Sequence, residues 1–456
     1  MAATEIHADE TRVFQRLLDA PYPNVERGEG VWLYRVDGSS ILDASGGGAM
    51  VTCLGHGRND IVEAAAAQAE RLAYIYYHQF TNEPQELLAR RVLDVAAPEM
   101  ARVRFVTGGS EANEMALRLV RQYHVDRGDE ERWRVIAPAQ AYHGATFGTL
   151  ALVGRRTLRH PYEPYLADHR HFPPSTSRFD PSGEQALAEL DRVIEEAGAE
   201  TIAAVFCEPV SAAALPAYSP PDRFWQGLAE RRERDGFLIC FDEVVTGFGR
   251  TGTWFAGHQL PLDPDVVIFG KGLGAGYAPL AGILCRSHVY DAVAAASRNF
   301  EHGHTWDGAP VFCAVGLAVL DELVGLGLVD RVAERGPRLR EELASALADF
   351  QLVYEVRGRG FLLGVELVDP RDGESLLPSE VNAAALVDTT ALEHDLLVTS
   401  SHSSPDGYAG DQTLLAPAYT ATDEELSAMV ERFAATIAAV QRKVEDALAT
   451  AAAGRT

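Results

Sequence analysis

Residues 237–274 read FLICFDEVVTGFGRTGTWFAGHQLPLDPDVVIFGKGLG, and their pattern indicates the fold. Two apolar runs, 237–244 and 266–270, are rich in β-branched and aromatic residues and are bounded by turn residues, as buried strands are. Asp242 stands near the end of the first run, and Lys271 directly follows the second. Because ligands of α/β sheets bind at the carboxyl ends of the strands, both residues are candidates for a functional site.

The neighbouring segments continue this alternation of short apolar runs with helical periods, which is typical of a parallel sheet covered by helices. Further strands are expected at 103–107, 134–138, 202–207 and 281–285, and helices at 110–124, 185–197, 222–234 and 310–326. In the last third, long helical patterns surround a few strands that include 364–368; these patterns cover 330–349, 379–393 and 422–450.

These patterns predict an α/β protein with two domains. We expect a large domain at 65–325, in which helices sandwich a mostly parallel central sheet. A smaller α+β domain is expected from both ends of the chain, 1–64 and 326–456. Within the N-terminal piece, residues 28–57 are rich in glycine and hairpin-like.

The composition argues against several classes of protein. The 456 residues include 40 basic and 66 acidic side chains, a net charge of −26. Such a surface repels phosphate backbones and anionic lipids, so we expect small-molecule ligands and neither nucleic acid nor membrane as a partner. The sequence has no apolar leader and no run of 18 apolar residues, which favours a cytoplasmic protein. Its five scattered cysteines form no CxxC pair, so we expect buried thiols in a reducing compartment.

Lysine is almost absent from the chain. Of the 40 basic residues only Lys271 and Lys443 are lysines. A lysine amine can lose its proton and form a Schiff base, whereas arginine does neither. Lys443 lies in a charged helical pattern and is expected on the solvated surface. Lys271 lies among glycines at the end of a buried strand, so we expect a nucleophile there, with a structural ion pair as the alternative.

Two more motifs have both a functional and a plain interpretation. Residues 106–114 read VTGGSEANE, a glycine turn before a helix, whose exposed N–H groups can bind a phosphate. The alternative is an ordinary helix cap by Ser110. Asp242 and Val244 share one face of their strand and Glu243 points away, so Asp242 can face a ligand. The alternative for Asp242 is a carboxylate that caps a loop.

Other catalytic motifs are excluded. Residues 247–252 match GxGxxG, but no helical period and no acidic residue about 20 positions further on follow them, so a nicotinamide dehydrogenase is rejected. The sequence has no GxSxG, HExxH or GxxxxGK[ST] motif. The histidine pairs 169/171 and 302/304 are expected in polar loops, and no metal site is expected.

Taken in order, Gly109-Ser110, Tyr142-His143-Gly144, Asp242 and Lys271 resemble the class III aminotransferases, which are pyridoxal-phosphate enzymes of fold type I. The resemblance covers nearly the whole chain, and the subgroup named by it is the ω-amino acid or amine:pyruvate aminotransferases. Its most specific stretches are 108–113, 242–252, 271–280 and 302–310.

The resemblance assigns a role to each matching position. Lys271 matches the lysine that binds pyridoxal 5′-phosphate covalently and moves the proton, and Asp242 matches the partner of the pyridine nitrogen, so these two are the expected catalytic residues. The expected cofactor-binding residues also include Gly109, Ser110, Tyr142, His143, Glu208, Val244 and Thr305. Thr305 is expected from the neighbouring subunit, which implies a homodimer with active sites at the subunit interface.

Two questions stay open at this point. A racemase, aminomutase or decarboxylase of the same fold is the alternative activity, since all of these use the same lysine–cofactor link. Residues 372–431 contain no arginine or lysine, although many relatives place a carboxylate-binding arginine there. We therefore expect amines or ω-amino acids to be better donors than α-amino acids, with an arginine from elsewhere holding the keto acid acceptor.

Overall fold

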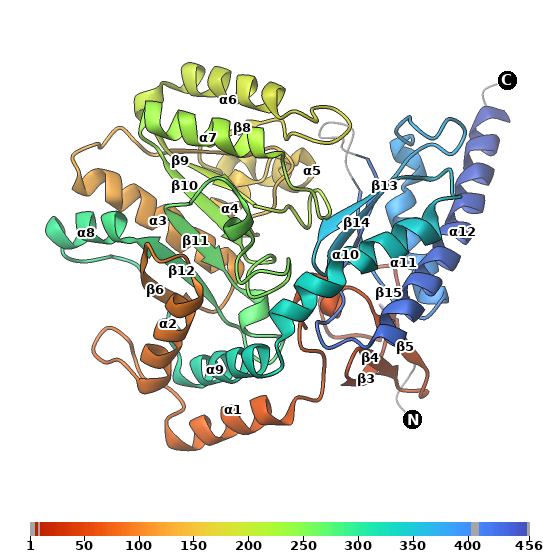
Figure 1. The fold of residues 1–456 in the computed structure, drawn as a ribbon, viewed down its shortest axis with the longest axis horizontal. Coiled ribbons are helices and arrows are strands. Elements are labelled where there is room, and N and C mark those ends of the chain that lie inside the picture. The colour runs from red at the N-terminus through yellow and green to blue at the C-terminus, as the bar shows by residue number, and fades with distance from the viewer. Residues whose placement is uncertain (1–4, 8–9, 403–409, 454–456) are drawn as a thin grey trace.

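The computed structural model describes residues 5–7, 10–402 and 410–453, and the chain forms two adjoining parts (Figure 1). The larger part holds a seven-stranded sheet, and the smaller part holds two four-stranded sheets. A short pairing of β1 (Glu5–Ile6) with β2 (Tyr22–Pro23) precedes them in the chain.

The central sheet has the strand order β6-β12-β11-β10-β9-β7-β8. Its strands are β6 Met100–Val106, β7 Arg134–Pro138, β8 Arg170–Phe172, β9 Ile202–Cys207, β10 Leu238–Glu243, β11 Val266–Phe269 and β12 Ala281–Arg286. Neighbours from β8 to β11 are parallel, whereas β12 is antiparallel to both β11 and β6. The predicted α/β class with a mostly parallel sheet is confirmed, although the sequence analysis did not predict β8.

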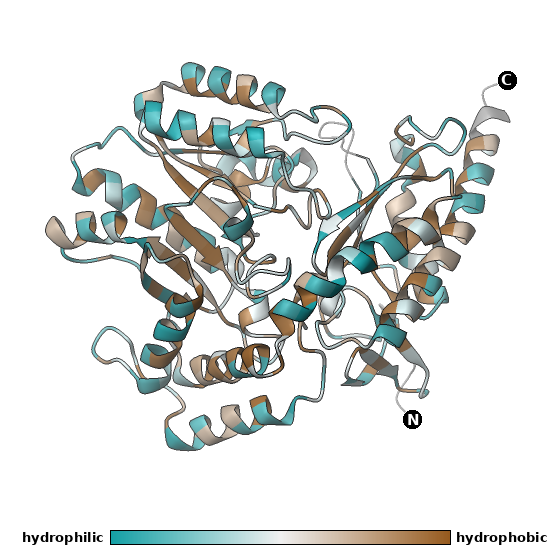
Figure 2. Cartoon of the chain, in the orientation of Figure 1, coloured by the Kyte–Doolittle hydropathy of each residue, from teal (hydrophilic) through white to brown (hydrophobic). Residues whose placement is uncertain are grey.

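Helices cover both faces of this sheet (Figure 1). The helices of the larger part are α1 Asn59–Arg71, α2 Glu83–Val95, α3 Gly109–Asp126, α4 Phe147–Leu152, α5 Arg156–Arg159, α6 Glu184–Ala197, α7 Asp222–Asp235, α8 Ser287–Ala295 and α9 Pro310–Gly325. Successive strand residues point to opposite faces, so Cys240 packs with residues of α3 while Ile239 and Phe241 pack with residues of α6 and α7. Figure 2 shows strands that are mainly hydrophobic, as expected for a sheet buried on both faces.

The smaller part combines both ends of the chain. Strands β3 (Val25–Glu29), β4 (Trp32–Arg35) and β5 (Ser40–Asp43) are antiparallel, and β15 (Leu396–Leu397) pairs parallel with β5. The second sheet has the order β13-β14-β17-β16, with bounds Val353–Arg359, Leu362–Leu367, Gln412–Leu415 and Thr399–Ser401. Its helices are α10 Leu328–Leu347, α11 Ala383–Glu393 and α12 Asp423–Ala453. One apolar core runs through both parts, and the domain limits at 64/65 and 325/326 stay a prediction.

Two further expectations concern cysteines and membrane spans. All five cysteines are buried and unpaired, as their spacing predicts. Within the described residues, no single helix is both long and apolar enough to cross a membrane; the bent pair α9–α10 meets that test only with its two helices taken together.

Candidate functional site

The predicted site residues gather at one edge of the central sheet. The carboxyl ends of β6, β7, β9, β10 and β11 carry, in that order, Gly109 and Ser110, Tyr142 and His143, Glu208, Asp242, and Lys271. These five strands run in the same direction, so their carboxyl ends meet at the same edge. Ligands of open α/β sheets bind at this edge.

Asp242 is held in place by three neighbours. The residue is buried, with 5% exposed. Its Oδ2 accepts a hydrogen bond from Asn113 Nδ2 (3.0 Å) and lies 2.8 Å from His143 Nδ1, and its Oδ1 accepts from the Val244 N–H (3.0 Å). Burial disfavours a charge on the His143 ring, but the hydrogen bond and the charge of Asp242 raise the pKa of His143 above its ordinary value. The neighbours thus fix the carboxylate in one orientation.

Asn113 also belongs to this group, although it is not among the site residues predicted from the sequence. Its Nδ2 also donates to the Gly109 carbonyl (3.0 Å), while its Oδ1 is buried without a partner among the described residues. Asn113 lies four residues after Gly109 on α3, a spacing that places both on one helix face. That spacing is the signal that could have revealed it.

Lys271 occupies a strained and half-buried position. Its φ of 37° lies in the left-handed region, which non-glycine residues rarely adopt. No described residue forms a hydrogen bond or ion pair with its Nζ. Burial lowers the pKa of Lys271 to about 8, although the nearby carboxylates of Asp242 and Glu208 favour the charged amine. An amine with this pKa is partly neutral near pH 8, so it can serve as a nucleophile or a base.

The start of α3 forms a cradle with little side-chain bulk. The N-cap Gly108 has no side chain, and Ser110 Oγ accepts a hydrogen bond from the Ala145 N–H (3.1 Å) rather than from its own helix. The alternative interpretation of Ser110 as a helix cap is therefore wrong. A Cβ on Gly109 would lie 2.9 Å from Val244 Cγ1, so glycine is needed there. The free N–H groups of the helix start can bind an anion such as a phosphate.

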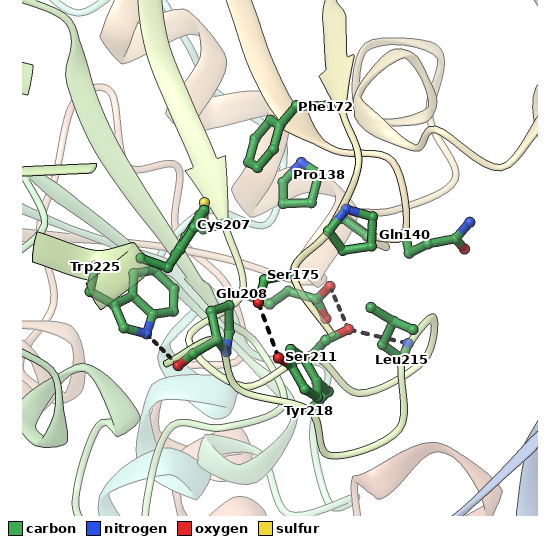
Figure 3. A pocket seen from close by; sticks show the side chains of 14 residues that line it. Pro138, Gln140, Phe172, Ser175, Cys207, Glu208, Ser211, Leu215, Tyr218 and Trp225 are labelled. Carbon is green, nitrogen blue, oxygen red and sulfur yellow. Dashed lines mark hydrogen bonds between the residues drawn. The ribbon is translucent and has the colours of Figure 1, made fainter. Parts of the chain in front are cut away.

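Glu208 lines a small cavity (Figure 3). Its Oε2 accepts hydrogen bonds from the Tyr142 N–H (3.3 Å) and from Ser211 Oγ (3.2 Å). Burial raises the pKa of Glu208 to about 7. The cavity, which Tyr218 and Trp225 also line, has a volume of about 30 Å³, enough for about one water molecule. It is therefore too small to bind a substrate.

The remaining motifs form hydrogen bonds that hold the fold together. Glu243 points away from Asp242, as strand alternation predicts, and accepts hydrogen bonds from two backbone N–H groups of η4 (Ala256–Gln259) at 2.6 and 2.8 Å. Residues 247–252 form a turn without a phosphate-binding helix, as expected. In this turn, Arg250 Nη1 donates to two backbone carbonyls of the smaller part at 2.6 and 3.1 Å.

Thr305 is the predicted site residue that the structure of one chain does not bring into the group. It is exposed, its carbonyl accepts a hydrogen bond from Tyr74 Oη (3.0 Å), and no described contact joins it to Lys271. The described histidines, cysteines and carboxylates include no cluster of three that could hold a metal ion.

Comparisons with known proteins give a consistent result. Residues 15–437 match the family model Aminotransferase class-III. Diaminobutyrate--2-oxoglutarate transaminase of Halomonas elongata is 32% identical over 450 residues, which cover 94% of this chain and 92% of that protein. An amine transaminase from an uncultivated Pseudomonas species, solved in its PLP-bound form, is 30% identical with a TM-score of 0.87 and covers 94% of this chain and 99% of its own. An (S)-enantioselective omega-transaminase from Thermomicrobium roseum is 33% identical, with a TM-score of 0.84 and coverage of 91% and 92%.

Proposed function

This chain belongs to the class III aminotransferase family and is an aminotransferase, and from that premise we propose that it moves an amino group from an amine or ω-amino acid to a keto acid such as pyruvate. The observation that carries the proposal is the amine of Lys271. It is one of two lysines in the chain, it has a pKa of about 8, and it stands at the same sheet edge as the carboxylate of Asp242.

The residues at this edge fit pyridoxal 5′-phosphate. The free N–H groups at the start of α3, with Gly109 and Ser110, would hold the phosphate. Asp242 would hold the pyridine nitrogen, and Val244 and Tyr142 would enclose the ring, because Val244 already contacts Gly109 and Tyr142 is tied to Glu208. The cofactor, when bound, supplies an electron sink for the negative charge that develops on the substrate carbon.

The protein's own residues would carry out the proton transfer. Lys271 Nζ, neutral in part near pH 8, takes the proton from the substrate carbon that bears the amino group, and later returns it. Asn113 and His143 hold the Asp242 side chain in place, where it would face the pyridine nitrogen and favour its protonated form. Glu208 fixes the backbone of Tyr142 through its hydrogen bond.

We further propose that two copies of the chain form each pair of active sites. Tyr74, which contacts Thr305, and the adjacent Trp306 are exposed aromatic residues that pack edge to face. The segment that carries Tyr74 exposes three more large apolar side chains, Leu72, Tyr76 and Phe80. A group of exposed aromatic residues of this kind favours burial by a second copy, which would bring Thr305 to the neighbouring phosphate. The five buried, unpaired cysteines support a cytoplasmic location.

Two experiments test the proposed function. Purified enzyme should absorb near about 400–430 nm, lose this band with borohydride, and lack it in Lys271→Ala. Absence of the band in the wild-type enzyme would refute the cofactor assignment. A donor–acceptor screen then separates aminotransfer from the alternatives, since a racemase, aminomutase or decarboxylase converts its substrate without a keto acid acceptor.

A further inference from the structure

Arg155 is a half-buried cation whose described contacts are to uncharged groups. Its Nη1 lies 3.5 Å from Ser401 Oγ, its Nη2 donates to the His402 carbonyl, and its Nε is buried with no acceptor among the described residues. No described carboxylate forms an ion pair with it, and the charge that acts on it is that of Arg16, which has the same sign. Burial and Arg16 together lower the pKa of Arg155.

A buried guanidinium without a carboxylate partner costs free energy. The chain has 66 acidic residues that could have supplied such a partner. Other buried arginines of this chain form ion pairs with carboxylates. Arg357 Nη1 lies 2.7 Å from Glu366 Oε2, and Arg335 Nε lies 2.7 Å from Asp423 Oδ1. The buried Nε of Arg155 is thus a donor that a bound anion can satisfy.

The position of Arg155 connects it with the proposed active site. It follows α4, whose chain leads directly from Tyr142, and the preceding Gly154 packs so tightly that a Cβ would lie 2.4 Å from Ala139 Cα. Arg155 thus starts beside the loop that carries Tyr142.

The other end of the Arg155 side chain reaches β16, and contacts lead from there to the Lys271 loop. Thr399 in β16 donates from Oγ1 to the Gly48 carbonyl (2.9 Å). In the same turn, Thr52 packs against Gly276, five residues after Lys271. Figure 1 shows α5 (Arg156–Arg159) on the side of the large part that faces the smaller part. Arg155 therefore lies where the two parts meet, on the segment that follows the Tyr142 loop.

We propose that Arg155 binds the carboxylate of the keto acid acceptor. The proposal rests on the proposed function and names the residue that replaces the cation missing from 372–431. A guanidinium can grip a carboxylate with two parallel hydrogen bonds, and the free Nε of Arg155 provides one of the two donors.

The test uses Arg155→Gln and Arg155→Lys in the holoenzyme, with Arg159→Gln as the matched control. Arg159 lies one helical turn further on, also has a buried Nε without a partner, and pairs with His171 (3.2 Å). Three quantities are measured: kcat/KM for pyruvate, kcat/KM for the carboxylate-free acceptor butanal, and the dissociation constant of inert propanoate by calorimetry.

We expect Arg155→Gln to lower kcat/KM for pyruvate by about 10–100-fold, mainly through KM, and to weaken propanoate binding by a similar factor. Butanal should change by less than about twofold, Arg155→Lys should recover part of the pyruvate effect, and Arg159→Gln should leave both acceptors unchanged. Equal losses for both acceptors would show that Arg155 only joins the two parts, and unchanged propanoate binding would also overturn the proposal. Failure of the wild-type enzyme to use any acceptor would refute the proposed function instead, and propanoate binding would still test Arg155.

Discussion

Asp242→Asn tests whether the buried carboxylate drives the reaction. The substitution keeps the shape of the side chain but removes its charge. Asp242 accepts three hydrogen bonds or ion-pair contacts, from Asn113, His143 and the Val244 N–H. An asparagine can present its oxygen to only one side, so its NH2 group faces at least one of these donors.

The expected loss follows from this environment. At 5% exposure, water cannot replace the missing charge. Removing one partner of a buried ion pair typically costs about 3–5 kcal/mol, which corresponds to a rate loss of about 150- to 5,000-fold when the charge is needed in the transition state. His143, whose pKa Asp242 raises, would also lose its proton more easily.

The assay is the half-reaction of the holoenzyme with an amine donor, followed by absorbance in a stopped-flow instrument. Glu243→Gln is the matched control, because it is the same change one residue away on the opposite face, where backbone N–H groups hold the carboxylate. We expect Asp242→Asn to bind cofactor and lose most of its rate, and Glu243→Gln to lower the Tm but keep its rate within about threefold. A loss of less than about tenfold for Asp242→Asn would mean that the carboxylate is only structural.

Four further predictions concern the lysine, the cradle and the substrates. Lys271→Ala and Lys271→Arg should both abolish turnover and leave the fold intact, and near-wild-type turnover in either would refute the role of the amine. In the cofactor-free protein, the rate of forming the band at about 400–430 nm should rise with pH through a midpoint of about 8, because burial lowers the pKa of Lys271 and only the neutral amine attacks; a midpoint near 10.5 would contradict this. Gly109→Ala should weaken cofactor binding, measured by equilibrium dialysis, since its Cβ would lie 2.9 Å from Val244 Cγ1; unchanged binding would remove Gly109 from the site. An aryl amine or β-alanine should give a higher kcat/KM than alanine, and a clear preference for alanine or glutamate would show that an α-carboxylate is well held.

The fold was predictable where burial dictates composition. Strands such as β7 and β9 are predicted with the bounds that the structure has, because both faces of a covered sheet select apolar residues. β8 was not predicted, because its three residues, Arg170–Phe172, lie at the sheet edge and include two charged or polar side chains. The antiparallel direction of β12 could not be predicted either, since a buried strand has the same apolar pattern in both directions.

Some site residues can be recognised from the sequence next to them, whereas others depend on contacts between distant segments. Lys271 and Asp242 stand out in the sequence by scarcity and by position at a strand end. The spacing of Asn113 from Gly109 places it on the face of α3 that bears the cradle, but its partner Asp242 lies 129 residues away and could not be read from that spacing. Arg155 contacts His402, 247 residues away, and no local pattern reveals it.

The chain uses arginine for almost every positive charge, and the different chemistry of lysine and arginine accounts for the roles proposed for Lys271 and Arg155. A half-buried lysine shifts its pKa readily, as the value of about 8 for Lys271 illustrates, and this makes it useful where a proton must be gained and lost. At Arg155, burial would lower the pKa of a lysine, so that its charge would be lost as the pH rises, whereas a guanidinium keeps its charge and can hold a carboxylate at any pH at which the enzyme works. If Arg155→Lys loses pyruvate affinity as the pH rises while the wild-type enzyme does not, the two residue types divide the chemistry of this site: lysine moves the proton, and arginine supplies the fixed charge.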